Sequence, residues 1–242
     1  MKINKKILVG VVSAALVVIV GVTAGYGAIN YSGPLRYLSV VRILLQNPPE
    51  EHQGGIVFYG ASNFRLWDTM EEDMASYGYP EVVNNGFGGC SDEDLIRYAP
   101  QLLFPYEPEV VFIQTGSNDY ALSGLDAEEV KKNKVEMYSY FAENLPDTTF
   151  IVMSGLPLPG RTEYWDNIQT VNAVIEEYCA ETERFYYVDS NPAMLNDDGS
   201  FKPEYFIEDQ IHLNQEGHDA WTVLMIQALD EIGYHQQESV SK

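Results

Sequence analysis

Residues 56–67 read IVFYGASNFRLW, and this stretch guides the interpretation of the rest of the chain. Its first four residues are apolar, aromatic or β-branched and lie between glycines, which predicts a short buried strand. Gly60 permits a sharp exit, and Ser62 then precedes residues 64–76, which have helical spacing. In open α/β sheets, ligands bind beyond the carboxyl ends of the strands. Ser62 is therefore placed either as a nucleophile or simply as the cap of the following helix.

From Gly55 onward, the hydrophobic pattern alternates between strand-like and helix-like segments. Short apolar runs predict strands at residues 56–59, 81–83, 109–114, 149–153 and 185–188. Helical spacing predicts helices near residues 64–76, 92–104, 127–145, 164–183 and 215–232. Capping signals precede three of these helices, at Ser91, Asp126 and Asn214. This alternation predicts an α/β domain whose parallel sheet is covered by helices on both faces.

The length and charge of the chain limit the classes of protein it could belong to. Its 242 residues have room for one α/β domain of about 200 residues and an appendage. Three lysines precede residue 30, so the remaining 11 basic residues face all 36 acidic ones, a net charge of −25. Such a surface repels nucleic acids, which are not an expected partner. Cys90 and Cys179 are too few for a disulfide framework, and we expect Cys179 to be a free core thiol.

Residues 7–29 form an uncharged run of 23 residues behind three lysines. As a helix this run would span about 35 Å, enough to cross a bilayer core of about 30 Å. Lysines on the amino-terminal side of the run predict a cytoplasmic amino terminus and a domain outside the cell membrane. The alternative is a cleaved signal peptide and a secreted protein, although such peptides normally have an apolar region of about 7–15 residues.

Residues 31–54 separate this run from the domain and predict a connector. Apolar residues recur there at helical spacing before residues 47–49 (NPP) end the pattern: Leu35, Leu38, Val41 and Leu45. This connector could pack on the domain or on the membrane surface. We thus expect a membrane anchor or uncleaved signal over residues 1–30, one domain over 55–235 and a polar tail over 236–242.

Two further motifs follow predicted strands. Residues 84–91 read NNGFGGCS, where glycines let backbone N–H groups turn toward a ligand and a helix start favours negative charge. A phosphate-binding loop is the competing interpretation, but neither GxxxxGK[ST] nor GxGxxG is present. Residues 114–119 read QTGSND, in which Asn118 either offers a neutral donor toward the same crevice or belongs to an ordinary turn.

Residues 209–214 read DQIHLN and lie just before the last predicted helix. The three-residue spacing lets the Asp209 carboxylate reach Nδ1 of His212, which fixes the tautomer and leaves Nε2 as a base. A metal site is the alternative, since Glu216 and His218 lie nearby, but no HxxxH pattern or cysteine pair is present. We therefore expect no metal. Together the motifs supply a nucleophile, oxyanion donors, a base and an orienting acid.

In this combination, the sequence resembles the SGNH or GDSL-type esterases and acylhydrolases from about residue 55 to 234. Ser62 resembles the family's nucleophile, and Asp209 with His212 resembles its DxxH pair. Gly89 and Asn118 resemble its backbone and side-chain oxyanion donors, which act with the Ser62 N–H.

One departure from the family pattern lies at the serine itself. Residues 60–63 read GASN where the family usually has GDSL. The aspartate before the serine is not a triad member, so the expected chemistry is unaffected. Residues 65–67, 84–89 and 156–161 are also similar to one branch of small GDSL-like proteins.

The resemblance implies a flavodoxin-like three-layer α/β/α sandwich with a five-stranded parallel sheet, distinct from the α/β-hydrolase fold. It also implies two-step acyl transfer that needs no metal or organic cofactor. Short segments after the predicted strands leave little room for a lid, so we expect a small acyl ester, acetyl above all, on a small molecule or a glycan. Two alternatives remain: an acyltransferase that uses the same residues, and an anchored binding protein in which Ser62 is unreactive.

Overall fold

The computed structural model describes residues 36–235, and a five-stranded sheet in the order β2-β1-β3-β4-β5 forms its centre. All neighbouring strands pair in parallel. The strands are β1 (Ile56–Gly60), β2 (Val82–Asn84), β3 (Val110–Gln114), β4 (Thr149–Met153) and β5 (Phe185–Val188). The predicted parallel sheet is confirmed, and every strand boundary lies within one residue of its predicted position.

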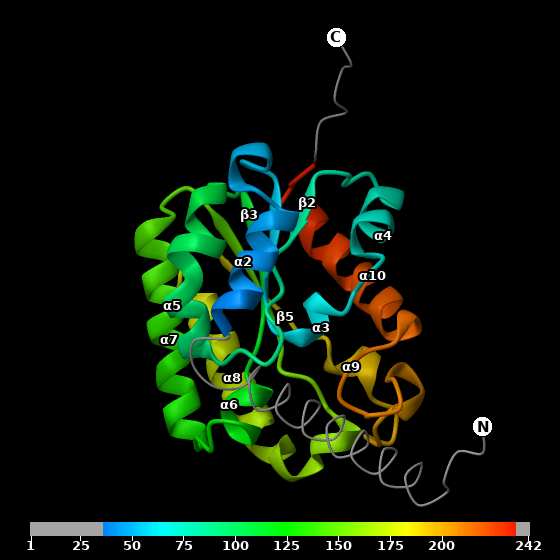
Figure 1. Cartoon of the computed structure of the whole chain (residues 1–242). Helices are drawn as coiled ribbons and strands as arrows, with labels where there is room; N and C mark the ends of the chain where they lie inside the picture. Colours follow the sequence, from blue (N-terminus) through cyan, green and yellow to red (C-terminus); the bar gives the residue numbers. More distant parts are fainter. Residues whose placement is uncertain (1–35, 236–242) are drawn as a thin grey trace, which may run out of the picture.

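The chain changes direction across the sheet at β1, because β2 lies on one side of this strand and β3 on the other. At such a switch point, a crevice opens beyond the carboxyl ends of the strands. The short helix α3 (Ser62–Arg65) follows β1 directly, and α6 (Ser117–Ala121) follows β3. In Figure 1 these strand ends point downward, toward α3 and α6. The topology alone therefore places Ser62 and Asn118 at the same edge of the sheet, after neighbouring strands.

Helices cover both faces of the sheet and complete a three-layer sandwich (Figure 1). One face carries α2 (Arg36–Gln46), α5 (Asp92–Leu102), α7 (Ala127–Asn144) and α8 (Trp165–Glu181). The other face carries α4 (Met70–Ser76) and α10 (Gln215–Glu231). The connections contain shorter turns: η2 (Pro49–Glu51), η3 (Phe104–Tyr106), η4 (Pro159–Tyr164), α9 (Asn191–Met194) and η5 (Pro203–Tyr205).

Strand β1 shows how the two cores are built. Its side chains alternate between the faces, as the two-residue period of a strand requires. Val57 and Tyr59 belong to the core under α5, α7 and α8, whereas Ile56 and Phe58 belong to the core under α4 and α10. Because helices cover both faces, every residue of β1 is buried. A strand of this kind is recognised by a continuous apolar run rather than by alternation.

The predicted helix starts agree with the structure. Ser91 and Asp126 each form a complete capping box, with Asp94 and Glu129 respectively. The side chain of Asn214 accepts a hydrogen bond from the N–H of Gly217 at the start of α10. These caps fix where the chain turns from a loop into a helix at the carboxyl edge of the sheet.

The single helix predicted over residues 64–76 is wrong, because the structure divides this segment into α3 and α4. In the intervening turn, the side chains of Trp67 and Thr69 both donate to Asp73 Oδ2, at 2.7 Å each. Side-chain bonds of this kind compete with a continuous helix. Phe64, Trp67 and Met70 are nevertheless all buried. Apolar residues three positions apart therefore fit two short helices joined by a turn as well as they fit one continuous helix.

The helical spacing noted in the connector corresponds to α2, which ends just before residues 47–49, but other side chains of this helix pack on the domain. Leu38 and Leu45 are 60% and 79% exposed, whereas Val40 and Ile43 are 0% and 2% exposed. Both pairs of residues have helical spacing, but only Val40 and Ile43 are buried in the core of the domain. At the end of α2, the Asn47 side chain donates to the Asn84 carbonyl at 3.0 Å. The helix α2 is therefore part of the domain's packing.

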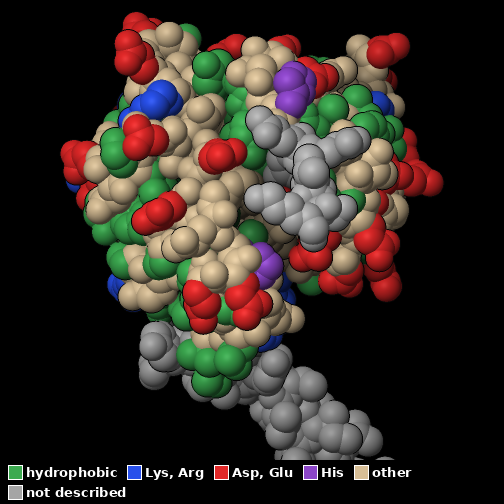
Figure 2. All heavy atoms as spheres, turned by 90° about the horizontal axis from the view of Figure 1, so that it is seen from above, with side chains coloured by type: hydrophobic (Ala, Val, Ile, Leu, Met, Phe, Trp, Pro, Cys, Tyr) green, Lys and Arg blue, Asp and Glu red, His purple; other side chains and the backbone are tan. Residues whose placement is uncertain are grey.

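Some predictions concern residues outside the described part of the chain. The apolar run 7–29 and the tail 236–242 both lie there. Between residues 36 and 235, no helix is long and apolar enough to cross a bilayer. Cys90 and Cys179 are buried free thiols, which confirms the expectation for Cys179. Figure 2, which views the end of the domain opposite the crevice, shows many acidic side chains and few basic ones.

Candidate active site

Ser62, His212 and Asp209 form one hydrogen-bonded chain at the carboxyl edge of the sheet. His212 Nε2 lies 2.8 Å from Ser62 Oγ, and His212 Nδ1 lies 2.6 Å from Asp209 Oδ2. The bond to a carboxylate places the imidazole proton on Nδ1, which leaves Nε2 to accept the hydroxyl proton of Ser62. This arrangement can turn a serine hydroxyl into a nucleophile.

The Asp209 carboxyl is held in its charged form. Partial burial works against its charge, but hydrogen bonds outweigh this effect and lower the pKa of Asp209. Its Oδ1 accepts from the backbone N–H groups of Ile211 and His212, at 2.9 and 3.0 Å. Its Oδ2 faces the imidazole ring. The aspartate is therefore ionised at neutral pH and can stabilise a positive charge on His212.

The position of Ser62 depends on the close packing of the residues before it. A side chain at Gly60 would meet the Gln114 carbonyl oxygen at 2.3 Å, so only glycine fits at the end of β1. Ala61 is the N-cap residue of α3, and Ser62 is the first residue inside that helix. The interpretation of Ser62 as a helix cap is therefore wrong. The Ser62 hydroxyl is turned toward His212 instead.

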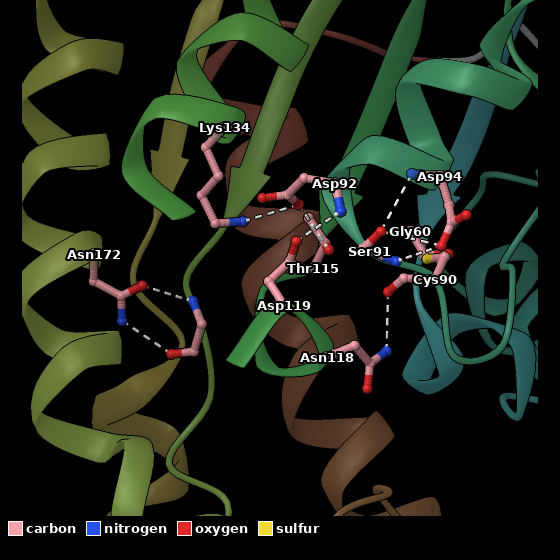
Figure 3. A network of polar contacts seen from close by, with 11 residues as sticks. Gly60, Cys90, Ser91, Asp92, Asp94, Thr115, Asn118, Asp119, Lys134 and Asn172 are labelled. Carbon is pink, nitrogen blue, oxygen red and sulfur yellow. Dashed lines mark hydrogen bonds and ion pairs between the residues drawn. The ribbon is translucent and has the colours of Figure 1, made fainter. Parts of the chain in front are cut away.

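Asn118 lies against the glycine-rich loop that follows β2, as Figure 3 shows. Its Nδ2 donates to the Cys90 carbonyl at 3.0 Å, and the residue is only 6% exposed. Gly89, next to Cys90, has a φ of +71°, a left-handed conformation that favours glycine. The Phe87 N–H donates to the Gly60 carbonyl at 2.7 Å and joins this loop to the end of β1. The structure thus gathers the predicted Ser62, Gly89 and Asn118 segments at neighbouring strand ends.

A cluster of buried ionisable groups lies beside Asn118, above it in the view of Figure 3. The Asp92 carboxylate accepts from Thr115 Oγ1 at 3.0 Å and faces Lys134 Nζ at 3.5 Å, while the Asp92 N–H donates to Asp119 Oδ1. Burial and then the charge of Asp92 raise the pKa of Asp119 to about 8. This rise favours the protonated form of Asp119. This cluster links the starts of α5 and α6, the two elements that flank the Cys90–Asn118 bond.

Asn63 is a residue of the site that no sequence motif predicted. Its Oδ1 accepts from the Leu213 N–H at 2.9 Å, and its carbonyl oxygen lies 3.2 Å from His218 Nε2. Asn63 is 6% exposed and holds the segment after His212 against α3. The bonded residues are 150 positions apart, so no local pattern could reveal the contact. The only signal was the asparagine at the end of GASN.

His218, considered above as part of a metal site, has a packing role instead. Its ring stacks on Trp67 with centroids 4.8 Å apart and an interplanar angle of 0°. Burial lowers the pKa of His218 to about 4, so the ring is neutral and donates its Nε2–H to the Asn63 carbonyl. Over residues 36–235, no group of three or more His, Cys, Asp or Glu side chains is placed to hold a metal ion.

The turn at η4, which follows β4, touches both halves of the site. The Gly160 N–H donates to the Gln210 carbonyl at 2.8 Å. A side chain at Gly160 would meet the Asp209 carbonyl oxygen at 2.8 Å. Arg161 Nη1 reaches Ser117 Oγ at 2.9 Å and Asn118 Oδ1 at 3.0 Å. The sequence places a loop over residues 157–165 near Ser62, but the individual contacts of Arg161 are distant in sequence and no local pattern predicts them.

Comparisons with known proteins agree with this architecture. The profile of the GDSL-like Lipase/Acylhydrolase family matches residues 55–220. No curated protein matches the chain. A GDSL-like lipase from Bacteroides thetaiotaomicron is 24% identical, with a TM-score of 0.65, over 80% of this chain and 98% of that one.

Two further solved structures show the same fold. A lipase/acylhydrolase from Enterococcus faecalis is 21% identical, with a TM-score of 0.62, over 77% of this chain and 100% of that one. A family 3 carbohydrate esterase from Clostridium thermocellum is 17% identical, with a TM-score of 0.58, over 74% and 97% of the two chains.

Proposed function

Because the chain belongs to the GDSL-like lipase/acylhydrolase family and is a GDSL-type esterase, we propose that it hydrolyses small acyl esters with Ser62 as the nucleophile. In this proposal His212 is the general base and Asp209 orients it. The observation that carries the proposal is the chain of short hydrogen bonds from Ser62 Oγ through the imidazole to Asp209, 2.8 and 2.6 Å. This geometry meets the distance requirement for a general base before any substrate is considered.

The reaction follows from these positions in two steps. His212 Nε2 takes the proton of Ser62 Oγ as the oxygen attacks the ester carbonyl, and then returns that proton to the leaving alcohol. Water then attacks the acyl carbonyl and gives a proton to His212, which passes it to Ser62 Oγ as the bond between Ser62 and the acyl group breaks and the acid leaves. In both steps the oxyanion is held by the N–H groups of Ser62 and Gly89 and by Asn118 Nδ2. One N–H of Asn118 is bonded to the Cys90 carbonyl, and the second is the donor we assign to the oxyanion.

Open access to the reacting groups supports a small acyl group on a larger alcohol. The side chains of His212 and Asp209 are 22% and 41% exposed. Side chains that are open to solvent fit a small acyl group better than a long acyl chain held in an enclosed tunnel, and they are compatible with a bulky alcohol such as a glycan. One of the similar solved structures is named a carbohydrate esterase, and this name supports a carbohydrate ester as the substrate. The net charge of −25 after residue 29 disfavours polyanionic polymers as substrates.

A chain-length series tests the acyl preference. With p-nitrophenyl esters, kcat/KM should be highest at C2 to C4, fall stepwise and be small by C12. The fall is gradual because each methylene changes discrimination by only about 1–3 kcal/mol. A maximum at C10 or beyond would contradict the small-acyl proposal. If no ester is hydrolysed but a phosphonate labels Ser62 in the folded protein, an O-acyltransferase that passes the acyl group to a glycan hydroxyl is favoured.

We also propose that residues 7–29 anchor the chain in the cell membrane with the domain outside. The apolar length of this run and the three lysines before it support this placement. Cells expressing the full chain should hold a protein of undiminished mass in the membrane fraction, and external protease should digest its domain. A soluble product that begins near Gly25 would instead indicate a cleaved signal and secretion. Protection of the domain in intact cells would contradict the outside placement.

A further inference from the structure

Arg161 lies at the meeting point of the two halves of the site. It follows Gly160, whose backbone contacts the Asp209–His212 segment. The backbone of Arg161, with φ −145° and ψ 40°, departs from the helical conformation of its neighbours in η4. Its half-buried side chain reaches back to α6, where one nitrogen, Nη1, contacts both Ser117 and Asn118. The turn therefore touches the acid–base segment through its backbone and the oxyanion segment through one side chain.

The contacts of Asn118 define the orientation of its amide. A guanidinium group can only donate hydrogen bonds, and a backbone carbonyl can only accept them. Arg161 must therefore face Asn118 Oδ1, at 3.0 Å, and the Cys90 carbonyl must face Asn118 Nδ2, at 3.0 Å. With both ends of the amide held, its flip and its tilt are fixed. The second N–H of Nδ2 then has one direction left in which to donate.

The positive charge of Arg161 adds a second effect. Arginine keeps its charge at every working pH. A cation bonded to the amide oxygen withdraws electron density from that amide and makes its N–H groups stronger donors, as in other hydrogen-bond chains. The surrounding domain carries a net charge of −25, which opposes a developing oxyanion. Burial raises the pKa of Asp119, next to Asn118, and so favours the uncharged form of this neighbouring carboxyl.

We infer that Arg161 is a positioning residue for the oxyanion: it holds and polarises the Asn118 amide and so acts in the transition state without touching the reacting atoms. This inference rests on the proposed function. It predicts that Arg161 matters for turnover more than for substrate binding, and that its effect requires Asn118. A role in packing alone would lower stability without this dependence.

A double-mutant cycle on the full chain, with p-nitrophenyl acetate as substrate, tests the inference. Arg161→Met removes the charge and all donors while keeping an unbranched side chain. It should lower kcat by about tenfold or more, less than the loss of a whole oxyanion donor, with KM within about threefold. Arg161→Lys should recover part of kcat. In an Asn118→Ala background, Arg161→Met should change kcat by less than about twofold, because residues that act as a unit are not additive.

Two matched variants separate the contacts of Arg161. Arg97, exposed on α5, gives the control Arg97→Met, which should leave kcat and KM unchanged. Ser117→Ala removes the other acceptor of Arg161 and should have a smaller effect on kcat than Arg161→Met. Far-ultraviolet circular dichroism and the Tm of each variant show whether it is folded.

The inference is wrong if Arg161→Met lowers kcat as much without Asn118 as with it, or if it raises KM alone, which would indicate direct substrate binding. If the wild-type protein turns over no ester, the rate at which a fluorophosphonate labels Ser62 replaces kcat, because its phosphoryl oxygen needs the same donors. A wild-type protein that is neither active nor labelled overturns the proposed function together with this inference. An active wild type with an unaffected Arg161→Met variant overturns the inference alone.

Discussion

Replacing Ser62 with alanine should lower kcat for p-nitrophenyl acetate by about 10⁴- to 10⁶-fold, the usual cost of losing a nucleophile that works with a general base. The Ser62 hydroxyl is the only atom that the change removes from the chain of bonds to His212 and Asp209. The variant should therefore fold normally. Steady-state kinetics on the purified protein, with circular dichroism as the test of folding, measures both effects.

Ser76 provides the matched control for this change. Its hydroxyl is exposed at the end of α4 and donates to the Asp73 carbonyl, away from the site. Ser76→Ala should keep the wild-type kcat. A serine-directed organophosphonate should label the wild type and Ser76→Ala at residue 62, and should leave Ser62→Ala unlabelled. Near-wild-type turnover by Ser62→Ala would remove Ser62 from the role of nucleophile.

Replacing Asn118 with alanine should lower kcat by about 10²- to 10³-fold with little change in KM, because an oxyanion donor acts mainly in the transition state. The change also removes the bonds to Cys90 and Arg161, so a loss of stability of about 1–3 kcal/mol is expected as well. The kinetic effect is measured well below the Tm of the variant, so that the loss of stability does not contribute.

The control for the asparagine is Asn144, whose side chain donates to the Tyr140 carbonyl at the exposed end of α7. Asn144→Ala should leave kcat unchanged. If Asn118→Ala is less stable but turns over substrate at nearly the wild-type rate, then the asparagine supports the loop and is not an oxyanion donor.

The sheet could be predicted from the sequence because its three central strands, β1, β3 and β4, are buried on both faces. Residues 149–153 form β4 with the predicted bounds, since covered parallel strands are continuous apolar runs. The edge strand β5 is less buried and was still found at residues 185–188, because its residues are aromatic or β-branched. Ser62, Asp209 and His212 could also be selected, because each follows or precedes a predicted element. The apolar stripe of α2 could not, since two sets of residues had helical spacing and only contact with the domain distinguished Val40 from Leu38.

The hydrogen bonds that support the site could not be predicted from the sequence pattern. Arg161 and Asn118 are 43 positions apart, and Asn63 and Leu213 are 150 apart. Hydrogen bonds of this kind depend on which loops meet at the sheet edge, and hydrophobic periodicity carries no information about single polar pairs. The turn at Thr69 was missed for a related reason, because its side-chain bonds to Asp73 override a spacing that also fits a helix.

The distance along the chain between Ser62 and His212 has a consequence for how the site can change. Their bond closes a loop of 150 residues, and closing such a loop costs about 4 kcal/mol of chain entropy. A single hydrogen bond contributes only about 1 kcal/mol net, so this bond cannot hold the loop closed. Burial of apolar side chains can: Phe64 and Trp221 are both 0% exposed and contact each other with ring centroids 5.7 Å apart.

Each fully buried large apolar side chain contributes about 1.5–3 kcal/mol, so this pair alone matches the entropy of closure. Ser62 and His212 are thus brought together by the packing of Phe64 and Trp221, a few residues away from each. Their own hydrogen bond contributes little to closing the loop. Substitutions at the reacting atoms leave the scaffold intact, whereas a cavity at Phe64 or Trp221 would separate Ser62 from His212 without altering either. Such a scaffold tolerates changes at Ser62, Asp209 and His212 at little cost in folding.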